Sequence, residues 1–182
     1  MGQVVSVNLA EPRTLRRRGR EVCTGLWKVP ARGPVRVHEQ GLEGDLVGDL
    51  RIHGGLQKAV YAYAAEDTAW WEAELGRELG PGYFGENLTL SGIDVSGAPA
   101  GERWRVGSAL LEVTEPRSPC WKLAAKVGER GFERRFARAG RPGTYLSVVA
   151  PGAVSPGDPV QVEWRPPSVS PLSRGAPGPA RA

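Results

Sequence analysis

Residues 103–113 read RWRVGSALLEV, two short segments rich in Val and Leu on either side of Gly107-Ser108. Such runs predict strands bounded by turn residues. Similar strand-like segments lie at 3–9, 22–29, 35–37, 87–90, 145–149 and 160–164. Short strands at near-regular spacing, in a chain with 25 Gly and 16 Pro for frequent reversals, predict a mostly β fold. We expect a β-barrel with a few helices around it.

Two helices are expected outside the strands. Residues 66–78 (EDTAWWEAELGRE) place apolar residues at helical spacing and are followed by Gly80-Pro81-Gly82. A second helix is predicted after Pro119, from residue 121 to about residue 137. Residues 11–20 are predicted to form a polar loop or hairpin.

The last residues differ in composition from the rest of the chain. From residue 166 the sequence is rich in Pro, Gly, Ser and Ala, with few apolar side chains that could form a core. We therefore expect one domain over residues 1–165 and a disordered tail over residues 166–182.

Composition and charge narrow the class of protein. The 182 residues carry a formal net charge of +4, and arginines gather at 13–20 and 130–141. Such clusters can contact nucleic acid, a membrane surface or an anionic ligand. No aromatic residue interleaves with the first cluster for base stacking, so we expect solvated arginines there rather than nucleic-acid binding. Two cysteines, no signal-peptide pattern and no membrane-length apolar run predict a cytoplasmic protein without a membrane partner.

Cys120 is the strongest candidate for chemistry. Pro116 and Pro119 stiffen the backbone just before it, and the residues after it favour a helix. A helix N-terminus, with Arg117 and Lys122 nearby, is expected to lower the pKa of the thiol and favour the thiolate. A stiffly held thiolate is either a nucleophile or a soft metal ligand. The alternative is a buried, inert cysteine, which the spacing alone does not exclude.

Two further segments carry candidate binding residues. Residues 41–63 hold five glycines and alternate turns with brief apolar stretches. Within them, the turn His53-Gly54-Gly55 can form an anion-binding nest of backbone amides, to which Lys58 adds a positive charge. Asn87 opens a strand-like run and can recognise the edge of a heterocycle. The simpler alternatives are a surface turn and an asparagine that holds a loop.

Other common sites are excluded or disfavoured. The two cysteines and two histidines (His38 and His53) do not form a zinc-binding pattern, and no phosphate-binding loop motif is present. Asp45 and Asp49 are candidates for paired carboxylates, but Asp beside Gly more often makes a turn, and we expect turns.

Five short motifs in order carry a resemblance to a known family. They are Thr24-Gly25-Leu26-Trp27-Lys28, Gly41-Leu42-Glu43-Gly44-Asp45, His53-Gly54-Gly55 with Lys58 to Tyr63, Phe84-Gly85-Glu86-Asn87-Leu88 and Pro116 to Leu123. Together they resemble a MOSC domain (molybdenum cofactor sulfurase C-terminal domain) of the stand-alone YiiM-like branch. The resemblance runs from the first strand to about residue 164.

The resemblance implies a fold, a cofactor and a reaction. The family fold is a mostly β barrel with a few helices. Family members bind the pterin-based molybdenum cofactor through a cysteine that matches Cys120, and the YiiM-like branch reduces N-hydroxylated substrates such as hydroxylaminopurines and amidoximes. The resemblance leaves binding of pyridoxal phosphate open. Two cysteines cannot supply a fused iron–sulfur module, so electrons are expected from a separate reductase.

The resemblance also suggests roles for the candidate residues. Cys120 is the expected metal ligand. The cofactor's phosphate is assigned to Lys28, Lys58, Arg117 and Lys122 with the Gly54-Gly55 nest, the pterin or substrate edge to Asn87 and His53, and proton supply to His53. Many YiiM-like chains continue into a helical extension, where this chain has its Pro-rich tail.

Two competing hypotheses remain at the level of sequence. Cys120 could carry a persulfide, making the chain a sulfur carrier for cofactor maturation. The chain could also be a non-enzymatic module that binds an anionic small molecule or nucleic acid through its arginines. The first needs the same reactive thiol as the reductase hypothesis, and the second does not need Cys120.

Overall fold

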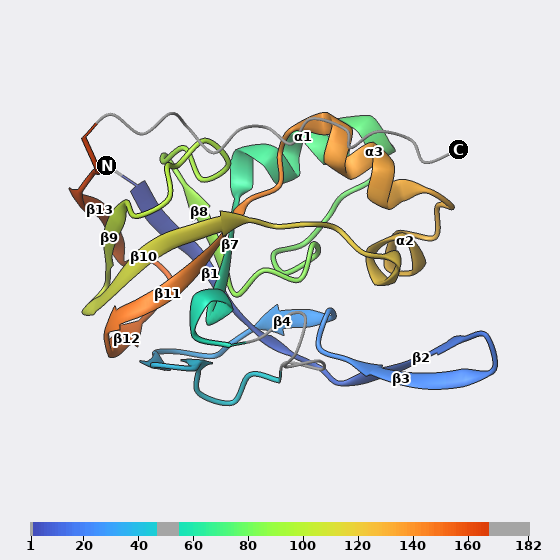
Figure 1. The fold of residues 1–182 in the computed structure, drawn as a ribbon, viewed down its shortest axis with the longest axis horizontal. Coiled ribbons are helices and arrows are strands. Elements are labelled where there is room, and N and C mark those ends of the chain that lie inside the picture. Colours follow the sequence, from blue (N-terminus) through green and yellow to red (C-terminus); the bar gives the residue numbers. More distant parts are fainter. Residues whose placement is uncertain (1, 47–54, 168–182) are drawn as a thin grey trace.

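The computed structural model describes residues 2–46 and 55–167. Its frame is one eight-stranded sheet, in the order β13-β9-β10-β11-β7-β8-β1-β4. The strands are β1 (Gly2–Ala10), β4 (Lys28–Pro30), β7 (Val60–Ala64), β8 (Leu88–Ser91), β9 (Arg103–Val106), β10 (Ala109–Pro116), β11 (Thr144–Ala150) and β13 (Pro159–Trp164). β13 also pairs with β1, so seven strands close into a barrel, and β4 lies outside the ring beside β1 (Figure 1). The predicted β-barrel fold is confirmed.

The barrel interior holds the main apolar core. Along β1 and β10, buried residues alternate with more exposed ones, as expected for strands with one face inward. Val7, Leu88, Trp104, Leu111 and Leu146 come from five different strands and are completely buried. Each buried aliphatic side chain of this kind contributes about 1.5–3 kcal/mol to folding.

Two smaller sheets extend the barrel. β5 (Val35–His38), β6 (Gly41–Leu42) and β12 (Gly152–Val154) form a three-stranded sheet. β2 (Arg13–Arg17) and β3 (Arg20–Thr24) pair only with each other. They form a hairpin where a polar loop or hairpin was predicted, and Figure 1 shows that it projects away from the barrel.

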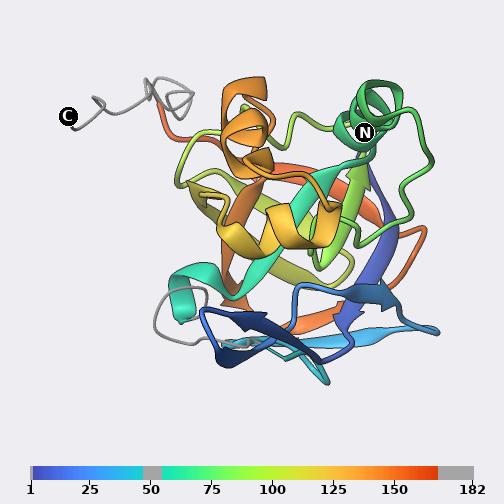
Figure 2. The same cartoon turned by 90° about the vertical axis from the view of Figure 1, so that its right-hand side faces the viewer.

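The helices pack around one end of the barrel. α1 (Ala65–Leu75), α2 (Trp121–Val127) and α3 (Phe132–Ala139) enclose a second apolar cluster with the outer face of the sheet (Figure 2). Trp71 of α1 stacks on Phe136 of α3, with 5.6 Å between ring centroids. A short 3₁₀ helix, η1 (Leu56–Lys58), precedes β7. Among the described residues, no helix combines the length and apolar character of a transmembrane span.

Two predicted elements had wrong boundaries and one strand was not predicted, for local reasons. The strand predicted at 22–29 divides into β3 and β4, which pair with different strands, β2 and β1. The helix predicted from 121 divides into α2 and α3 because Gly128 and Gly131 adopt left-handed backbone conformations, with φ of 82° and 83°. β7 lies in the glycine-rich stretch and lacks an alternating pattern, since all five of its residues are buried.

Some predictions fall outside the described residues. His53, Gly54 and Asp49 belong to residues 47–54, and most of the predicted tail belongs to residues 168–182. Their predicted roles are neither supported nor contradicted by the structure.

Candidate active site

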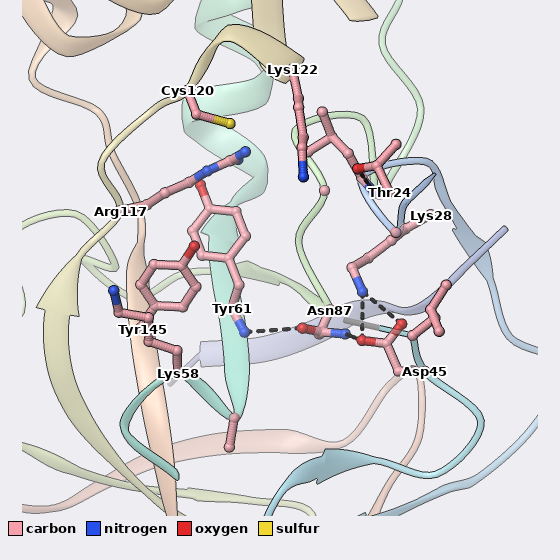
Figure 3. Close-up of a pocket in the computed structure, with 15 residues that line it drawn as sticks. Thr24, Lys28, Asp45, Lys58, Tyr61, Asn87, Arg117, Cys120, Lys122 and Tyr145 are labelled. Carbon is pink, nitrogen blue, oxygen red and sulfur yellow. Dashed lines mark hydrogen bonds and ion pairs between the residues drawn. The ribbon is translucent and has the colours of Figure 1, made fainter. Parts of the chain in front are cut away.

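A pocket opens where β7, the segment before β8 and the loop before α2 meet. Its empty volume is about 630 Å³, including the space open to solvent. The lining residues are Thr24, Gly25, Leu26, Lys28, Asp45, Leu46, Lys58, Ala59, Tyr61, Gly85, Asn87, Arg117, Cys120, Lys122 and Tyr145. Figure 3 shows Cys120, Arg117 and Lys122 at one end, with Lys28, Asp45 and Asn87 at the other.

Cys120 lies at the start of α2. It is the N-cap residue of the helix, in an extended conformation, and its backbone carbonyl accepts a hydrogen bond from the Leu123 amide at 2.9 Å. The side chain is partly exposed and directed into the pocket beside the Arg117 guanidinium (Figure 3). The thiol is therefore accessible from the pocket rather than sealed in the core.

Arg117 is a buried cation at the same end. It is 8% exposed, one Nη donates a hydrogen bond to the Phe84 carbonyl, and its Cζ lies 4.8 Å from the centroid of the Tyr61 ring. Burial acts to lower the pKa of Arg117, but Tyr61, Tyr145 and Cys120 outweigh it, and the pKa is raised. Arg117 thus keeps its charge close to the Cys120 thiol.

Lys122 follows Cys120 by two residues on the first turn of α2. It is only 8% exposed, yet its Nζ makes no hydrogen bond or ion pair with any residue that the structure describes. Figure 3 shows its side chain pointing into the pocket. An ammonium group held in this way is available to an anionic ligand.

Lys58 supplies another positive charge on the lining. Its Nζ forms an ion pair with Glu115 at 3.4 Å and lies 5.5 Å from the centroid of the Tyr145 ring. Its side chain remains 26% exposed.

Lys28, Asp45 and Asn87 form a buried network at the opposite end. Lys28 Nζ lies 2.7 and 2.6 Å from the two Asp45 carboxylate oxygens. Asn87 Nδ2 donates to Asp45 at 2.7 Å, and its Oδ1 accepts from the Tyr61 amide at 3.1 Å. Burial lowers the pKa of Lys28, and the charge of Asp45 opposes this shift. Asn87 and Lys28 are therefore already engaged in joining the pocket walls.

Asp45 does more than the turn expected from the sequence. Its amide does close a turn on the Leu42 carbonyl at 3.1 Å. Its carboxylate, however, is buried and also accepts a hydrogen bond from the Ala10 amide at 2.8 Å. The turn interpretation was incomplete because the partners of the carboxylate come from β1, β4 and the segment before β8.

Two tyrosines of the lining had no predicted role. Tyr61 on β7 and Tyr145 on β11 are partners in the sheet, with 5.3 Å between ring centroids. The Tyr61 hydroxyl donates to the Pro142 carbonyl at 2.8 Å. Burial raises the pKa of both phenols, so both remain protonated near neutral pH. The sequence gives little indication of this position, because aromatic residues in strand-like segments are usually core residues.

Lys126 does not line the pocket, but it connects two segments next to it. Its Nζ, on the last turn of α2, donates to the carbonyls of Leu26 at 3.0 Å and Gly82 at 3.2 Å. Burial lowers the pKa of Lys126 to about 8, against the opposing charge of Glu86. Glu86 is itself buried, and among the described residues its Oε2 has no hydrogen-bond partner.

The structure brings together most of the residues predicted for the site. Those that line this pocket are Cys120, Lys28, Lys58, Asn87, Arg117 and Lys122. Gly55 does not line it. It precedes η1 and borders a separate hollow next to His38 and Leu56.

Comparison with known proteins identifies the family. The MOSC domain model matches residues 49–161. The chain is 40% identical over 154 residues to the uncharacterized protein YflK of Bacillus subtilis (strain 168), covering 85% of this chain and 70% of YflK. It is 33% identical to protein YiiM of Escherichia coli (strain K12), covering 78% of this chain and 65% of YiiM. It is 32% identical to a protein of Gibberella moniliformis named reductase, but spans only 27% of that protein.

A solved structure agrees with this assignment. YiiM from Geobacillus stearothermophilus superposes with a TM-score of 0.78 at 32% identity, covering 96% of this chain and 81% of that chain. Sequence motifs, barrel topology and solved relatives all agree, and the chain belongs to the MOSC domain family.

Proposed function

We propose that this protein binds the pterin-based molybdenum cofactor and reduces N-hydroxylated substrates of the hydroxylaminopurine or amidoxime kind. The observation that carries the proposal is the Cys120 thiol, which faces one pocket together with Arg117 and the ammonium of Lys122, which has no partner among the described residues. Membership of the MOSC family and a relative named reductase support an oxidoreductase of this type.

The chemistry of the lining fits such a cofactor. One thiol is a ligand for a soft, redox-active metal. The positive charges of Arg117, Lys122 and Lys58 repel a bare cation but attract an anionic complex that brings its own phosphate. Cys120 would bind the metal, and these three side chains would hold the phosphate.

The rest of the pocket would position and protonate the substrate. The cofactor, when bound, supplies a two-electron centre that can accept an oxygen atom. For a hydroxylamine the balance is R–NHOH with two electrons and two protons giving R–NH2 and water, so the N–O bond breaks. The protonated hydroxyl of Tyr145 is available at the lining to donate a hydrogen bond to the substrate, whereas the Tyr61 hydroxyl already donates to the Pro142 carbonyl and can only accept one; His53 remains a predicted proton donor.

The Lys28–Asp45–Asn87 network would keep the opposite wall rigid. Its groups satisfy one another, so they would fix the shape of the pocket rather than contact the reacting atoms. The two electrons would come from a separate reductase, consistent with the two cysteines of this chain.

Metal analysis of purified protein tests the proposal. Wild type, Cys120→Ser and the matched control Cys23→Ser, which changes an exposed thiol on β3, are produced in a host that makes the cofactor. We expect molybdenum in wild type and Cys23→Ser, and its loss in Cys120→Ser. With a chemical reductant as electron donor, Cys120→Ser should also lose the ability to reduce hydroxylaminopurine. Equal molybdenum in all three proteins would contradict the proposal.

The same samples separate the sulfur-carrier alternative. That alternative predicts a transferable sulfur on Cys120, detectable as a mass increase that thiol reductants remove, without stoichiometric molybdenum. Such a result would replace the reductase proposal.

A further inference from the structure

The β2–β3 hairpin stands apart from the barrel. Its strands pair only with each other, and Figures 1 and 2 both show it projecting on the side of the molecule where α2 lies. Every arginine of the hairpin is exposed. A two-stranded hairpin is only marginally stable alone. Packing in the barrel core does not explain the side chains of this hairpin, because they lie outside it.

The hairpin tip concentrates positive charge at positions where strand pairing and turn geometry disfavour arginine. Arg17 and Arg20 are directly opposed partners across the two strands. Like charges in that position destabilise a hairpin. Arg18, between them, has a φ of 51°, and Gly19 follows with a φ of 74°. Turns with two positive φ values favour Asn-Gly, and an arginine at the first position costs about 1 kcal/mol.

These three arginines also lack neutralising partners in the part of the chain that the structure describes. Ion pairs on the hairpin join Arg13 to Glu11 and Arg16 to Glu21. Within residues 2–46 and 55–167, no carboxylate pairs with the three arginines of the tip, Arg17, Arg18 and Arg20. Departures from local rules of this kind are typical of functional positions, and here they suit an anionic partner.

The tip lies beside the candidate active site. The Arg17 guanidinium packs over the Trp121 ring, with its Cζ 4.7 Å from the ring centroid, and Trp121 directly follows Cys120. At its other end β3 runs into Thr24, the first residue of the pocket lining. A macromolecule bound at the tip would therefore sit next to the start of α2, where Cys120 lies.

We propose that the tip (Arg17, Arg18 and Arg20) docks the acidic face of a small flavin or iron–sulfur electron-transfer protein beside the Cys120 pocket. This inference rests on the proposed function, which needs two electrons per turnover from outside the chain. Charge complementarity favours such a partner. Nucleic acid fits less well, because residues 11–24 contain no aromatic side chain for base stacking and the Trp121 ring beside the tip is already covered by Arg17.

A charge-neutralised hairpin tests the proposal without weakening the fold. Arg18→Asn with Arg20→Gln removes two charges, relieves the opposed pair and places Asn-Gly in the turn. The matched control, Arg130→Gln with Arg134→Gln, removes two charges from exposed arginines at α3 and the loop before it. Binding is measured at about 50 mM salt, where charge interactions extend further than at physiological salt. The probes are a flavodoxin, a plant-type ferredoxin and an oligonucleotide.

We expect the hairpin variant to be at least as stable as wild type but to bind the redox protein more weakly. At least one redox protein should bind wild type and the control equally, and the hairpin variant about tenfold more weakly, although its melting temperature is unchanged or higher. Equal binding by the hairpin variant, or no binding of either redox protein to wild type, would overturn the proposal. Hairpin-dependent binding of the oligonucleotide alone would also overturn it and assign the tip to nucleic acid.

A second readout separates this inference from the proposed function. Hydroxylaminopurine reduction driven by reduced methyl viologen needs no protein donor, and the hairpin variant should retain it. Absence of this activity in molybdenum-loaded wild type would defeat the proposed function. Its presence, with redox-protein binding unaffected by the hairpin variant, would defeat only the docking proposal.

Discussion

At the scale of single residues, the charged side chains of the pocket differ in whether they are ion-paired. Lys28 is fully paired with Asp45, whereas Lys122 is as buried but makes no ion pair with any described residue. A paired buried charge stabilises a wall, while an unpaired one pointing into a cavity is available to a ligand. Residue type alone could not assign these roles, because both are lysines next to apolar neighbours.

The Lys28–Asp45 pair gives a stability prediction. Asp45→Asn leaves the Lys28 ammonium buried without its counter-charge, and we expect a loss of about 3–5 kcal/mol in the free energy of unfolding. Urea denaturation at neutral pH measures it. The double variant Lys28→Met with Asp45→Asn removes the stranded charge and should recover part of the loss. A double variant no more stable than Asp45→Asn alone would show that the ion pair is not the cause.

At the scale of elements, α2 connects the chemistry to the walls. The helix begins directly after Cys120 and carries Lys122 on its first turn, while Lys126 on its last turn bonds the carbonyls of Leu26 and Gly82. Since α2 has seven residues, these side chains lie within two turns of one another. A short helix thus links the thiol to two loops that are far from it in the sequence.

Lys126 predicts how stability depends on pH. Burial lowers its pKa to about 8 in the folded protein, whereas an unfolded lysine titrates near 10.4. Between these values the unfolded chain binds more protons, so the free energy of unfolding should rise with pH. The contribution of Lys126 is about 2 kcal/mol between about pH 7 and pH 10.

Denaturation of wild type and Lys126→Met across this pH range measures the contribution. The wild-type curve should rise relative to that of Lys126→Met. Parallel curves would mean that Lys126 titrates normally in the folded protein.

At the scale of the whole molecule, barrel closure ties the pocket to the core. β1 pairs with both β8 and β13, so the two ends of the described chain complete one ring. The pocket is built from segments on several sides of that ring, and its geometry depends on the ring being closed. Loss of core packing should therefore disturb the geometry of the pocket and lower the free energy of unfolding.

A cavity in the barrel tests this dependence. Leu111 on β10 is completely buried, and Leu111→Ala should cost about 2–5 kcal/mol. Val149→Ala on the neighbouring strand β11, where the side chain is 42% exposed, should cost about 0.5 kcal/mol or less. Thermal unfolding is followed by tryptophan fluorescence and, in a Cys23→Ser background, by the rate of Cys120 alkylation, which starts from the partly exposed native thiol and should rise in the same transition as the fluorescence changes. A rise in that rate well before unfolding would show that the site opens independently of the barrel.

Much of the fold was predictable because its signals are local. Short runs rich in Val and Leu on either side of Gly107-Ser108 predicted the strands at 103–106 and 109–113, and the prolines before Cys120 predicted where α2 begins. β7 was missed because a strand buried on both faces has no alternation, and the break between α2 and α3 was missed because isolated glycines inside a helical pattern are ambiguous.

The sequence by itself determined the fold family, the candidate thiol and the positive charges around it, because short motifs, turn residues and residue types are properties of neighbouring positions. Only the tertiary structure decided which partners those charges have among the described residues. Asn87 meets Asp45 from 42 positions away, and Arg117 meets the Phe84 carbonyl from 33 positions away. Such pairings arise when barrel closure brings distant segments to one pocket, and no local pattern encodes them.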